Sequence, residues 1–300
     1  MRPEALAKEL RRRLPGLRVK EGEPMSAHCA FRIGGPADLF LEPGSEAELI
    51  ETLLFLREMG ERPIVIGNGT NLLVRDEGVR APVVHIGEAL GGISADGIIL
   101  TAGAGASLSR IATAARDAGL SGFEFAHGIP GSLGGAIVMN AGAYGGEMKD
   151  VTVSVRYLDE GCALRETADL GFSYRRSRFS EGEGVILGAA LRLRPGDPAE
   201  IAARMHELWE RRSSSQPLSK PSAGSAFKRP ATGYAAAMID GAGLKGFKVG
   251  GAQVSEKHAG FVINAGGATC ADVLALMAHI QEAVEREYGV LLEPEVKLIG

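Results

Sequence analysis

The stretch GIPGSLGGAIVMNAGAYGG, residues 128–146, constrains the fold more than any other part of the chain. It places seven glycines within nineteen residues, more than an ordinary turn needs. Glycine leaves the backbone N–H groups uncovered, and Pro130 stiffens the loop, so less entropy is lost when a ligand binds. Between β segments, such a loop predicts a backbone site for the phosphates of a ligand.

A second loop of this kind, GNGTN at 67–71, directly follows the strand-like segment PIVIG. Such a turn can present several N–H donors to phosphate oxygens. Two of these loops predict a pyrophosphate cofactor that is held by backbone without a Rossmann turn. The G-x-G-x-x-G match GAGLKG at 241–246 follows a helical segment and precedes a strand, which is the reverse of the dinucleotide-binding context.

Composition limits the possible classes of protein. The 300 residues suit two or three domains, and 42 of them are glycine, about twice the usual frequency of roughly 7%. A net charge of −4 argues against general nucleic-acid binding. The sequence contains no long apolar run and only three dispersed cysteines. We therefore expect a cytoplasmic protein with reduced thiols, no membrane span and neither a disulfide framework nor a metal site.

Periodicity divides the chain into three stretches, 1–66, 67–195 and 196–295. The first contains a helix from Pro3 and a βαβ-like unit whose helix starts with a predicted capping box of Ser45 and Glu48. The second consists mostly of short β segments, with one clear helix near Ser107.

The third stretch begins with a helix that starts near Asp197 and has Ile201, Met205, Leu208 and Trp209 on its apolar face. The polar segment SSSQPLSKPSAGSAFKRP (213–230) follows it. A further helix is predicted from Thr269, with Asp272 at its third position. The final segment, VLLEPEVKLIG, has the pattern of a strand.

Three polar segments contain more side chains suited to catalysis or binding than loops usually do. Arg175 in YRRSRF carries a guanidinium fork suited to a carboxylate. Ser225 in PSAGSAFK lies between small residues, and Glu293 and Glu295 flank Pro294 in LEPEV. Each element alone is typical of a polar surface, but their occurrence together with two glycine loops favours an active site.

The chain resembles the family of UDP-N-acetylenolpyruvoylglucosamine reductases in seven ordered segments: HCAFRIGGPAD (28–38), GNGTNLLV (67–74), GIPGSLGGAIVMNAGAYGGE (128–147), YRRSRF (174–179), PSAGSAFK (221–228), VSEKHAGFVIN (254–264) and LEPEV (292–296). The resemblance covers nearly the whole chain. The short spacing between Tyr174 and Ser225 resembles the shorter of the family's two types.

This resemblance implies an α+β fold. Residues 1–66 and 67–195 would form two α/β subdomains of an FAD-binding domain of the vanillyl-alcohol-oxidase type, with 296–300 returning to the first. Residues 196–295 would form a separate α/β substrate-binding domain.

The resemblance also implies a reaction, in which NADPH reduces FAD. FAD then reduces UDP-N-acetylglucosamine enolpyruvate to UDP-N-acetylmuramate for peptidoglycan synthesis. We expect no nucleic-acid, membrane or obligate protein partner.

The resemblance implies roles for particular residues. Arg175, Ser225 and Glu295 would be catalytic. The expected FAD-binding residues are Gly67, Asn68, Gly69, Thr70, Asn71, Gly128, Ile129, Pro130, Gly131, Ser132, Gly134 and Gly135. The expected substrate-binding residues are Tyr144, Tyr174, Lys228 and Arg229. Cys29 and Ala30 replace hydroxyl residues of the family pattern, and Arg229 replaces an asparagine.

The chemistry explains why these catalytic side chains are required. Hydride from the flavin N5 would add to the terminal carbon of the enolpyruvyl group, and negative charge would accumulate on its carboxylate. Arg175 would stabilise that charge, and Glu295 could do so only when protonated, so we expect its pKa to be raised. Ser225 would supply the proton to the adjacent carbon.

Two other classes of protein use similar loops. A non-redox nucleotide-sugar binding protein would hold the pyrophosphate of its ligand in the same way, and another flavoprotein oxidase could share the FAD fold. Bound flavin separates the first alternative from a reductase. The Arg175, Ser225 and Glu295 motifs argue against the second.

Overall fold

The computed structural model describes residues 2–300. It contains two compact units, each assembled from three chain segments. The first comprises Met1–Glu21, Leu39–Asn68 and Ala81–Arg212, and the second Gly22–Asp38, Gly69–Arg80 and Ser213–Gly300. Both units combine helices and strands, which agrees with the predicted α+β class. The boundaries 1–66, 67–195 and 196–295 remain a prediction.

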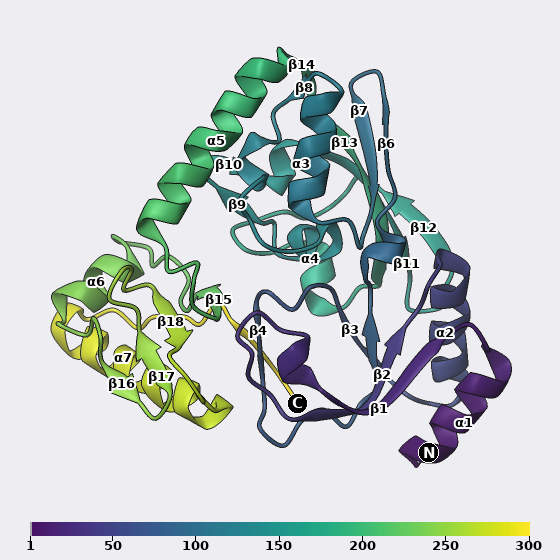
Figure 1. The fold of residues 1–300 in the computed structure, drawn as a ribbon, viewed down its shortest axis with the longest axis horizontal. Helices are drawn as coiled ribbons and strands as arrows, with labels where there is room; N and C mark the ends of the chain where they lie inside the picture. Colours follow the sequence, from purple (N-terminus) through teal and green to yellow (C-terminus); the bar gives the residue numbers. More distant parts are fainter. Residues whose placement is uncertain (1) are drawn as a thin grey trace. The chain divides into compact units, whose positions relative to one another are not determined.

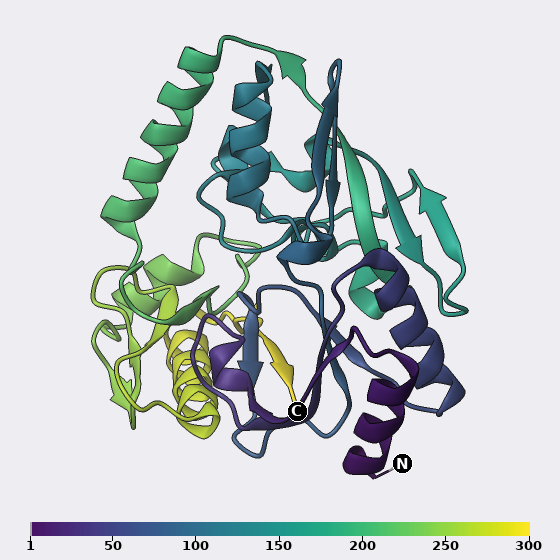
Figure 2. The same cartoon turned by 45° about the vertical axis from the view of Figure 1, so that its right-hand side comes forward.

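The central element of the first unit is an antiparallel five-stranded sheet. Its strand order is β12 (Leu164–Thr167), β11 (Thr152–Leu158), β13 (Val185–Arg192), β7 (Ile99–Gly103) and β6 (Ile93–Asp96). Helices α3 (Leu108–Asp117) and α4 (Leu133–Val138) pack against this sheet, and the turned view in Figure 2 separates α3 from the strands.

The two faces of this sheet differ in composition. In β7, Leu100 and Ala102 are buried, whereas Thr101 between these two residues is exposed. In the neighbouring strand β13, Ala189 and Leu191 are buried. Alternation with a period of two, as here, is expected when only one face of a sheet is covered. α3 buries Leu108, Ile111, Ala112 and Ala115, as its periodicity predicts, and Ser107 caps its first turn.

A second sheet has the order β1 (Arg18–Pro24), β2 (Pro36–Glu42), β5 (Val83–His85) and β3 (Ile64–Ile66). β2, β5 and β3 run parallel, and α2 (Glu46–Glu58) connects β2 to β3, so the predicted βαβ arrangement is present with β5 inserted. The predicted capping box at α2 is only half formed. Ser45 accepts the Glu48 N–H, but the Glu48 carboxylate accepts the Gly44 N–H instead.

The remaining elements of the first unit include two helices, α1 and α5. In α5, Ile201, Met205 and Leu208 are buried as predicted, but Trp209 is 44% exposed and does not belong to the core. The helix also continues into the polar segment that begins at residue 213. The bounds are α1 (Pro3–Arg13), η2 (Glu88–Leu90), β8 (Leu120–Ser121), η3 (Glu124–Ala126), β9 (Gly142–Ala143), β10 (Gly146–Glu147), η4 (Met148–Asp150), η5 (Arg178–Glu181), β14 (Arg194–Pro195) and α5 (Pro198–Ser215).

The second unit contains an antiparallel sheet of four strands with α7 (Cys270–Tyr288) packed against β16 and β17 (Figure 1). β4 pairs in parallel with β19, and only Lys297–Ile299 of the strand predicted over 290–300 is a strand. GAGLKG (241–246) starts at the last residue of α6 and ends before β16, so a helix precedes it and a strand follows, which argues against a Rossmann site. The bounds are η1 (Met25–Ala27), β4 (Leu72–Val74), β15 (Ser222–Ser225), α6 (Ala235–Gly241), β16 (Lys248–Val249), β17 (Ala252–Val254), β18 (Phe261–Asn264) and β19 (Lys297–Ile299).

None of the helices within residues 2–300 combines the length and apolar character needed to span a bilayer.

The N-terminus of α7 is held by two aspartates. Thr269 and Asp272 form the predicted capping arrangement, and Asp272 also accepts the Gly251 N–H at 3.1 Å. Asp76, almost 200 residues earlier, accepts the N–H groups of Cys270 and Ala271 at 2.8 and 3.1 Å. A carboxylate at this position satisfies otherwise unpaired donors and interacts favourably with the helix dipole.

We predict that Asp76→Ala lowers the free energy of unfolding by roughly 1 to 2 kcal/mol, because two N–H groups of α7 lose their acceptor. Urea denaturation followed by circular dichroism measures this. Asp117→Ala is the matched control, since Asp117 lies in an exposed ion pair with Arg116. Equal stabilities of the two variants would contradict the assigned role of Asp76.

Candidate active site

The two glycine loops meet within the first unit. Gly67 follows the end of β3, and Ser132 precedes α4. A Cβ atom at Gly67 would collide with Ser132 Oγ, so the absence of a side chain at residue 67 leaves room for this hydroxyl where the loops approach each other. Ser132 itself is 2% exposed, and its side chain caps no N–H group of α4.

The N–H groups of these loops fall into two sets. Leu133 and Gly134 donate to the carbonyls of Ala106 and Ala104, both at 2.9 Å. Within residues 2–300, by contrast, no acceptor receives the N–H groups of four other loop residues, Gly67, Asn68, Ser132 and Gly135. The first N–H groups of a helix such as α4 have no acceptor within the helix, so the open donors on these two adjoining loops can bind an anionic ligand.

A cavity of about 910 Å³ adjoins these loops in the first unit, lined by Gly67, Ser132, Gly134 and Gly135 among others. Leu53, Ile66, Val138, Leu158 and Ile186 contribute apolar wall. The cavity lies at the upper end of the usual size range for cofactor sites, and it combines apolar walls with a few polar groups as such sites do. A Cβ at Gly135 would meet only Ser132 Oγ, at 3.9 Å, so its Cα faces open space.

The other predicted cofactor residues differ in their surroundings. Gly128 packs closely, because a Cβ there would lie 3.2 Å from Arg212 Cδ and 3.6 Å from Trp209. Ile129 donates its N–H to Ala126, Pro130 is exposed, and Gly131 has a φ of +138°.

Gly69, Thr70 and Asn71 lie in the second unit. Gly69 has a φ of +60° and accepts the Ala30 N–H at 3.1 Å. Thr70 is partly buried in the turn before β4. Asn71 Nδ2 donates to the Glu295 carbonyl at 3.1 Å.

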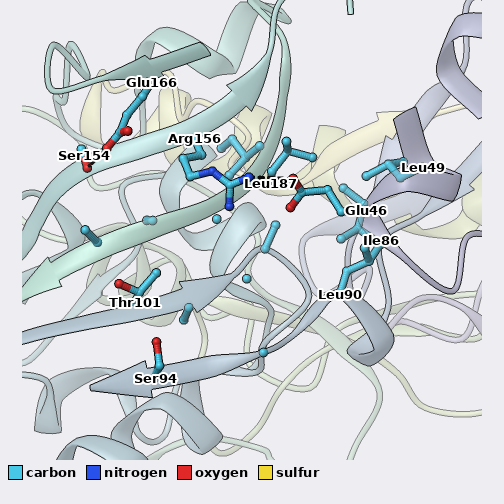
Figure 3. Close-up of a pocket in the computed structure, with 18 of the residues that line it drawn as sticks. Glu46, Leu49, Ile86, Leu90, Ser94, Thr101, Ser154, Arg156, Glu166 and Leu187 are labelled. Atoms are coloured by element: carbon cyan, nitrogen blue, oxygen red, sulfur yellow. Dashed lines mark hydrogen bonds and ion pairs between the residues drawn. The ribbon is translucent and has the colours of Figure 1, made fainter. Parts of the chain in front are cut away.

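A second cavity of about 480 Å³ lies over the face of the five-stranded sheet that carries small residues (Figure 3). Arg156 and Glu46 point toward one another at one side of it and form an ion pair at 2.6 Å. None of the predicted site residues lines this cavity. The glycine loops therefore favour the larger cavity as the cofactor site.

The segments that carry Ser225 and Glu295 lie side by side in the second unit. The Glu295 N–H donates to the carbonyl of Ala226, the neighbour of Ser225, at 2.9 Å. Lys228 N–H donates to the Glu293 carbonyl at 2.8 Å, so the two segments run side by side. The C-terminal segment thus places the Glu295 backbone next to the end of β15, which supports a shared site.

The predicted substrate residues of the second unit have partners of their own. Lys228 Nζ forms a close ion pair with the Glu293 carboxylate. Arg229 stacks over Tyr234, with its guanidinium carbon 4.2 Å from the ring centroid. Cys29 also departs from the family pattern. Its thiol is buried and donates to the Ile33 carbonyl at 3.1 Å. Burial raises the pKa of this thiol, which keeps it protonated.

Tyr174 and Arg175 lie in the first unit at the tip of a tight turn. Reciprocal backbone hydrogen bonds of 3.0 and 3.2 Å between Ser173 and Arg176 close it. Arg175 has a φ of +55°, which is uncommon for a residue with a side chain. Its guanidinium carbon lies 5.2 Å from the centroid of the Tyr174 ring.

Tyr144 occupies the tip of the β9–β10 hairpin. It has a φ of +53°, and Gly145 after it has a φ of +86°, the pattern of a two-residue type I′ turn. The side chain is 41% exposed, so it is available to a ligand.

Two further residues, Asn140 and Arg212, lie next to these elements and were not predicted from the sequence. Asn140 is fully buried and has a φ of +41°. Asparagine in a glycine-rich segment is typical of an ordinary turn. Its tolerance of positive φ was the one sequence signal that could have indicated a special role for residue 140. Arg212 packs on Gly128, and burial lowers its pKa while Tyr144 acts in the opposite direction. Nothing in the local sequence distinguishes Arg212 from the neighbouring arginine.

Comparisons with known proteins agree on one family. Residues 216–299 match the C-terminal domain of UDP-N-acetylenolpyruvoylglucosamine reductase, and residues 37–167 match an FAD binding domain. A reductase of this name from Caldanaerobacter subterraneus subsp. tengcongensis is 50% identical, covering 94% of this chain and 95% of the relative. One from Agathobacter rectalis is 47% identical over 99% of both chains.

A solved structure gives the same result. The crystal structure of UDP-N-acetylenolpyruvylglucosamine reductase from Thermus caldophilus superimposes with a TM-score of 0.82 at 35% identity, covering 95% of this chain and all of that one. Together these matches confirm the predicted fold class and the FAD-binding domain. The chain belongs to the UDP-N-acetylenolpyruvoylglucosamine reductase family.

Proposed function

We propose that the protein uses FAD and NADPH to reduce UDP-N-acetylglucosamine enolpyruvate to UDP-N-acetylmuramate in the cytoplasm, as a step of peptidoglycan synthesis. Family membership supports an FAD-dependent oxidoreductase. The observation that carries the proposal is the set of open N–H donors where the Gly67 and Ser132 loops meet beside the larger cavity.

The residues of the two loops fit a pyrophosphate. Gly67, Asn68, Ser132 and Gly135 would hold the phosphate oxygens of FAD through neutral N–H groups, which cost little reorganisation because the backbone already fixes them. Apolar residues of the same cavity suit the rest of a large cofactor. When bound, FAD supplies two-electron transfer between the nicotinamide and the enolpyruvyl group.

The catalytic side chains have the task of stabilising the electron-rich substrate as it is reduced. The two-electron reduction adds one hydride equivalent to the terminal carbon of the enolpyruvyl group. The double-bond electrons then move onto the carboxylate, where Arg175 provides a permanent positive charge. Tyr144, Tyr174, Lys228 and Arg229 would help to bind this substrate.

Ser225 and Glu295 complete the reaction in this proposal. Ser225 donates a proton to the carbon next to the carboxylate, so one hydride and one proton are added in total. Glu295, in its neutral form, donates a hydrogen bond to the developing charge. The Asn71 side chain and the Ala226 carbonyl hold the Glu295 backbone from both sides, which supports a fixed position for it.

We predict that Gly135→Leu lowers FAD affinity about tenfold or more without unfolding the protein. The added side chain enters open space beside Ser132, and leucine favours a helix more than glycine does. Absorbance near 450 nm of the purified protein measures bound flavin, and circular dichroism measures folding.

Gly92→Leu is the control, because Gly92 is exposed and lines the smaller cavity. Full flavin retention in Gly135→Leu would contradict the assignment of the loop. A colourless wild-type protein that cannot be reconstituted with FAD would favour a non-redox nucleotide-sugar binding protein.

We predict that Ser225→Ala reduces the rate of flavin reoxidation by the enolpyruvyl substrate by about 10²- to 10⁴-fold, because the proton donor is lost. Flavin reduction by NADPH stays near normal. Stopped-flow absorbance separates the two half-reactions. Ser222→Ala on the same strand is the matched control, and equal losses in both half-reactions of Ser225→Ala would exclude the proton-donor role.

We predict that reoxidation by the substrate slows as the pH rises and the Glu295 carboxyl loses its proton. Glu295→Gln, which keeps an N–H donor at every pH, lacks this alkaline decline. The pH profile of the single-turnover rate tests this, with Glu282→Gln as the control, because Glu282 is exposed on α7. A wild-type profile that is flat at alkaline pH would overturn the role of neutral Glu295.

A further inference from the structure

Asn140 lies where the chain leaves α4, in a conformation that few side chains tolerate. Its φ of +41° falls in the left-handed region, and the residue has no exposed surface. Asparagine is one of the few non-glycine residues that adopt this region readily. A buried polar side chain there needs partners for all of its donors and acceptors.

The Asn140 amide makes three hydrogen bonds of 3.0 Å. Its Nδ2 donates to the Glu147 carboxylate and to the Ser173 carbonyl, and its Oδ1 accepts the Lys149 N–H. Both N–H donors of the amide are therefore used, together with its oxygen. One side chain connects the hairpin that carries Tyr144 to the residue that starts the Tyr174–Arg175 turn.

The segment after this turn is tied to the same end of α4. The hydroxyls of Ser177 and Ser180 both donate to the Val138 carbonyl, at 3.0 and 2.7 Å. Since both serines follow the turn, they fix its far side, whereas Asn140 fixes the near side through Ser173.

Charges near Asn140 connect it to Arg175 as well. The hydrogen bond from Lys149 lowers the pKa of Glu147 most, against the opposing effect of burial, and Asn140 and the positive charge of Arg175 lower it further. Glu147 is therefore an ionised acceptor for Asn140, and its charge acts on Arg175.

We propose that Asn140 is a positioning residue, which holds the Ser173 carbonyl and so fixes the turn that presents Tyr174 and Arg175. This inference rests on the proposed role of Arg175 in the reaction. A positive φ at Arg175 is unfavourable, so the turn keeps its shape only where its surroundings impose it. Small displacements of a charge-stabilising group lower the rate strongly.

The test replaces Asn140 with aspartate, which has the same shape and also tolerates positive φ. The new carboxylate keeps an oxygen for the Lys149 N–H but presents its other oxygen, rather than an N–H donor, to the Ser173 carbonyl. We expect Asn140→Asp to slow reoxidation by the enolpyruvyl substrate about 10- to 100-fold. Flavin reduction by NADPH should change less than about twofold.

A double variant separates positioning from stability. In Asn140→Asp with Glu147→Gln, the amide introduced at position 147 can donate to the carboxylate introduced at position 140. The hydrogen bond between positions 140 and 147 is thus restored with its donor and acceptor exchanged, while the Ser173 carbonyl still lacks its donor. We expect thermal stability to return toward that of Glu147→Gln alone, while the slow reoxidation persists relative to that single variant.

Hydrogen–deuterium exchange provides a readout that does not depend on activity. Peptides covering 171–180 should exchange faster in Asn140→Asp and in the double variant, because the turn hydrogen bonds between Ser173 and Arg176 open. Thr152→Val is the matched control, since it removes one partly buried hydrogen bond to the Met148 carbonyl and none to the turn. Its 171–180 peptides should exchange as in the wild type.

Unchanged exchange at 171–180 in Asn140→Asp, recovery of reoxidation in the double variant, or equal slowing of both half-reactions would overturn the proposal. A failure of the proposed function would give a different experimental result from a failure of the proposal for Asn140. A wild-type enzyme whose flavin the substrate does not reoxidise would refute that function, while the exchange experiment would still decide whether Asn140 holds the turn.

Discussion

The close approach of Gly67 to Ser132 is the constraint on which the candidate cofactor site depends. It brings the end of β3 against the start of α4, and a Cβ atom at residue 67 would require the Ser132 hydroxyl to move. The sheet makes this approach possible. Ala104 and Ala106, which follow β7, accept the N–H groups of Gly134 and Leu133 and so hold the start of α4 in place. The N–H groups of Gly67, Asn68, Ser132 and Gly135 then remain without an acceptor among residues 2–300.

The two ends of α4 therefore have different structural roles. Its N-terminal end contributes open donors next to the cavity, while its C-terminal end, through Val138 and Asn140, holds the segment with Tyr174 and Arg175. A six-residue helix with little stability of its own can do both because Leu133 and Ile137 are completely buried. Packing against the sheet, rather than helix propensity, fixes the distance between these two groups of residues.

Local chemistry made much of this arrangement predictable. Ser107 and Thr269 start helices because their side chains accept hydrogen bonds from N–H groups of the first helical turn. Each of these signals spans only four residues of the sequence. The same kind of signal is incomplete at Ser45, where Gly44 competes for the Glu48 carboxylate. Trp209 fits the apolar stripe of α5, yet it is partly exposed because the burial of a stripe depends on its neighbours. Asn140 and Asp76 act on residues distant in sequence, which no local pattern encodes.

The segmental make-up of the second unit limits how it can be divided. A fragment that starts at Ser213 contains α7 and β19 but lacks Leu72–Val74, against which β19 pairs, and Asp76, which receives two N–H groups of α7. Such a fragment would expose the edge of a strand and would leave the N–H groups of Cys270 and Ala271, at the start of its longest helix, without their acceptor, although Thr269 and Asp272 would still cap that helix. Any polypeptide meant to reproduce this unit by itself therefore has to include the short inserted segments Gly22–Asp38 and Gly69–Arg80.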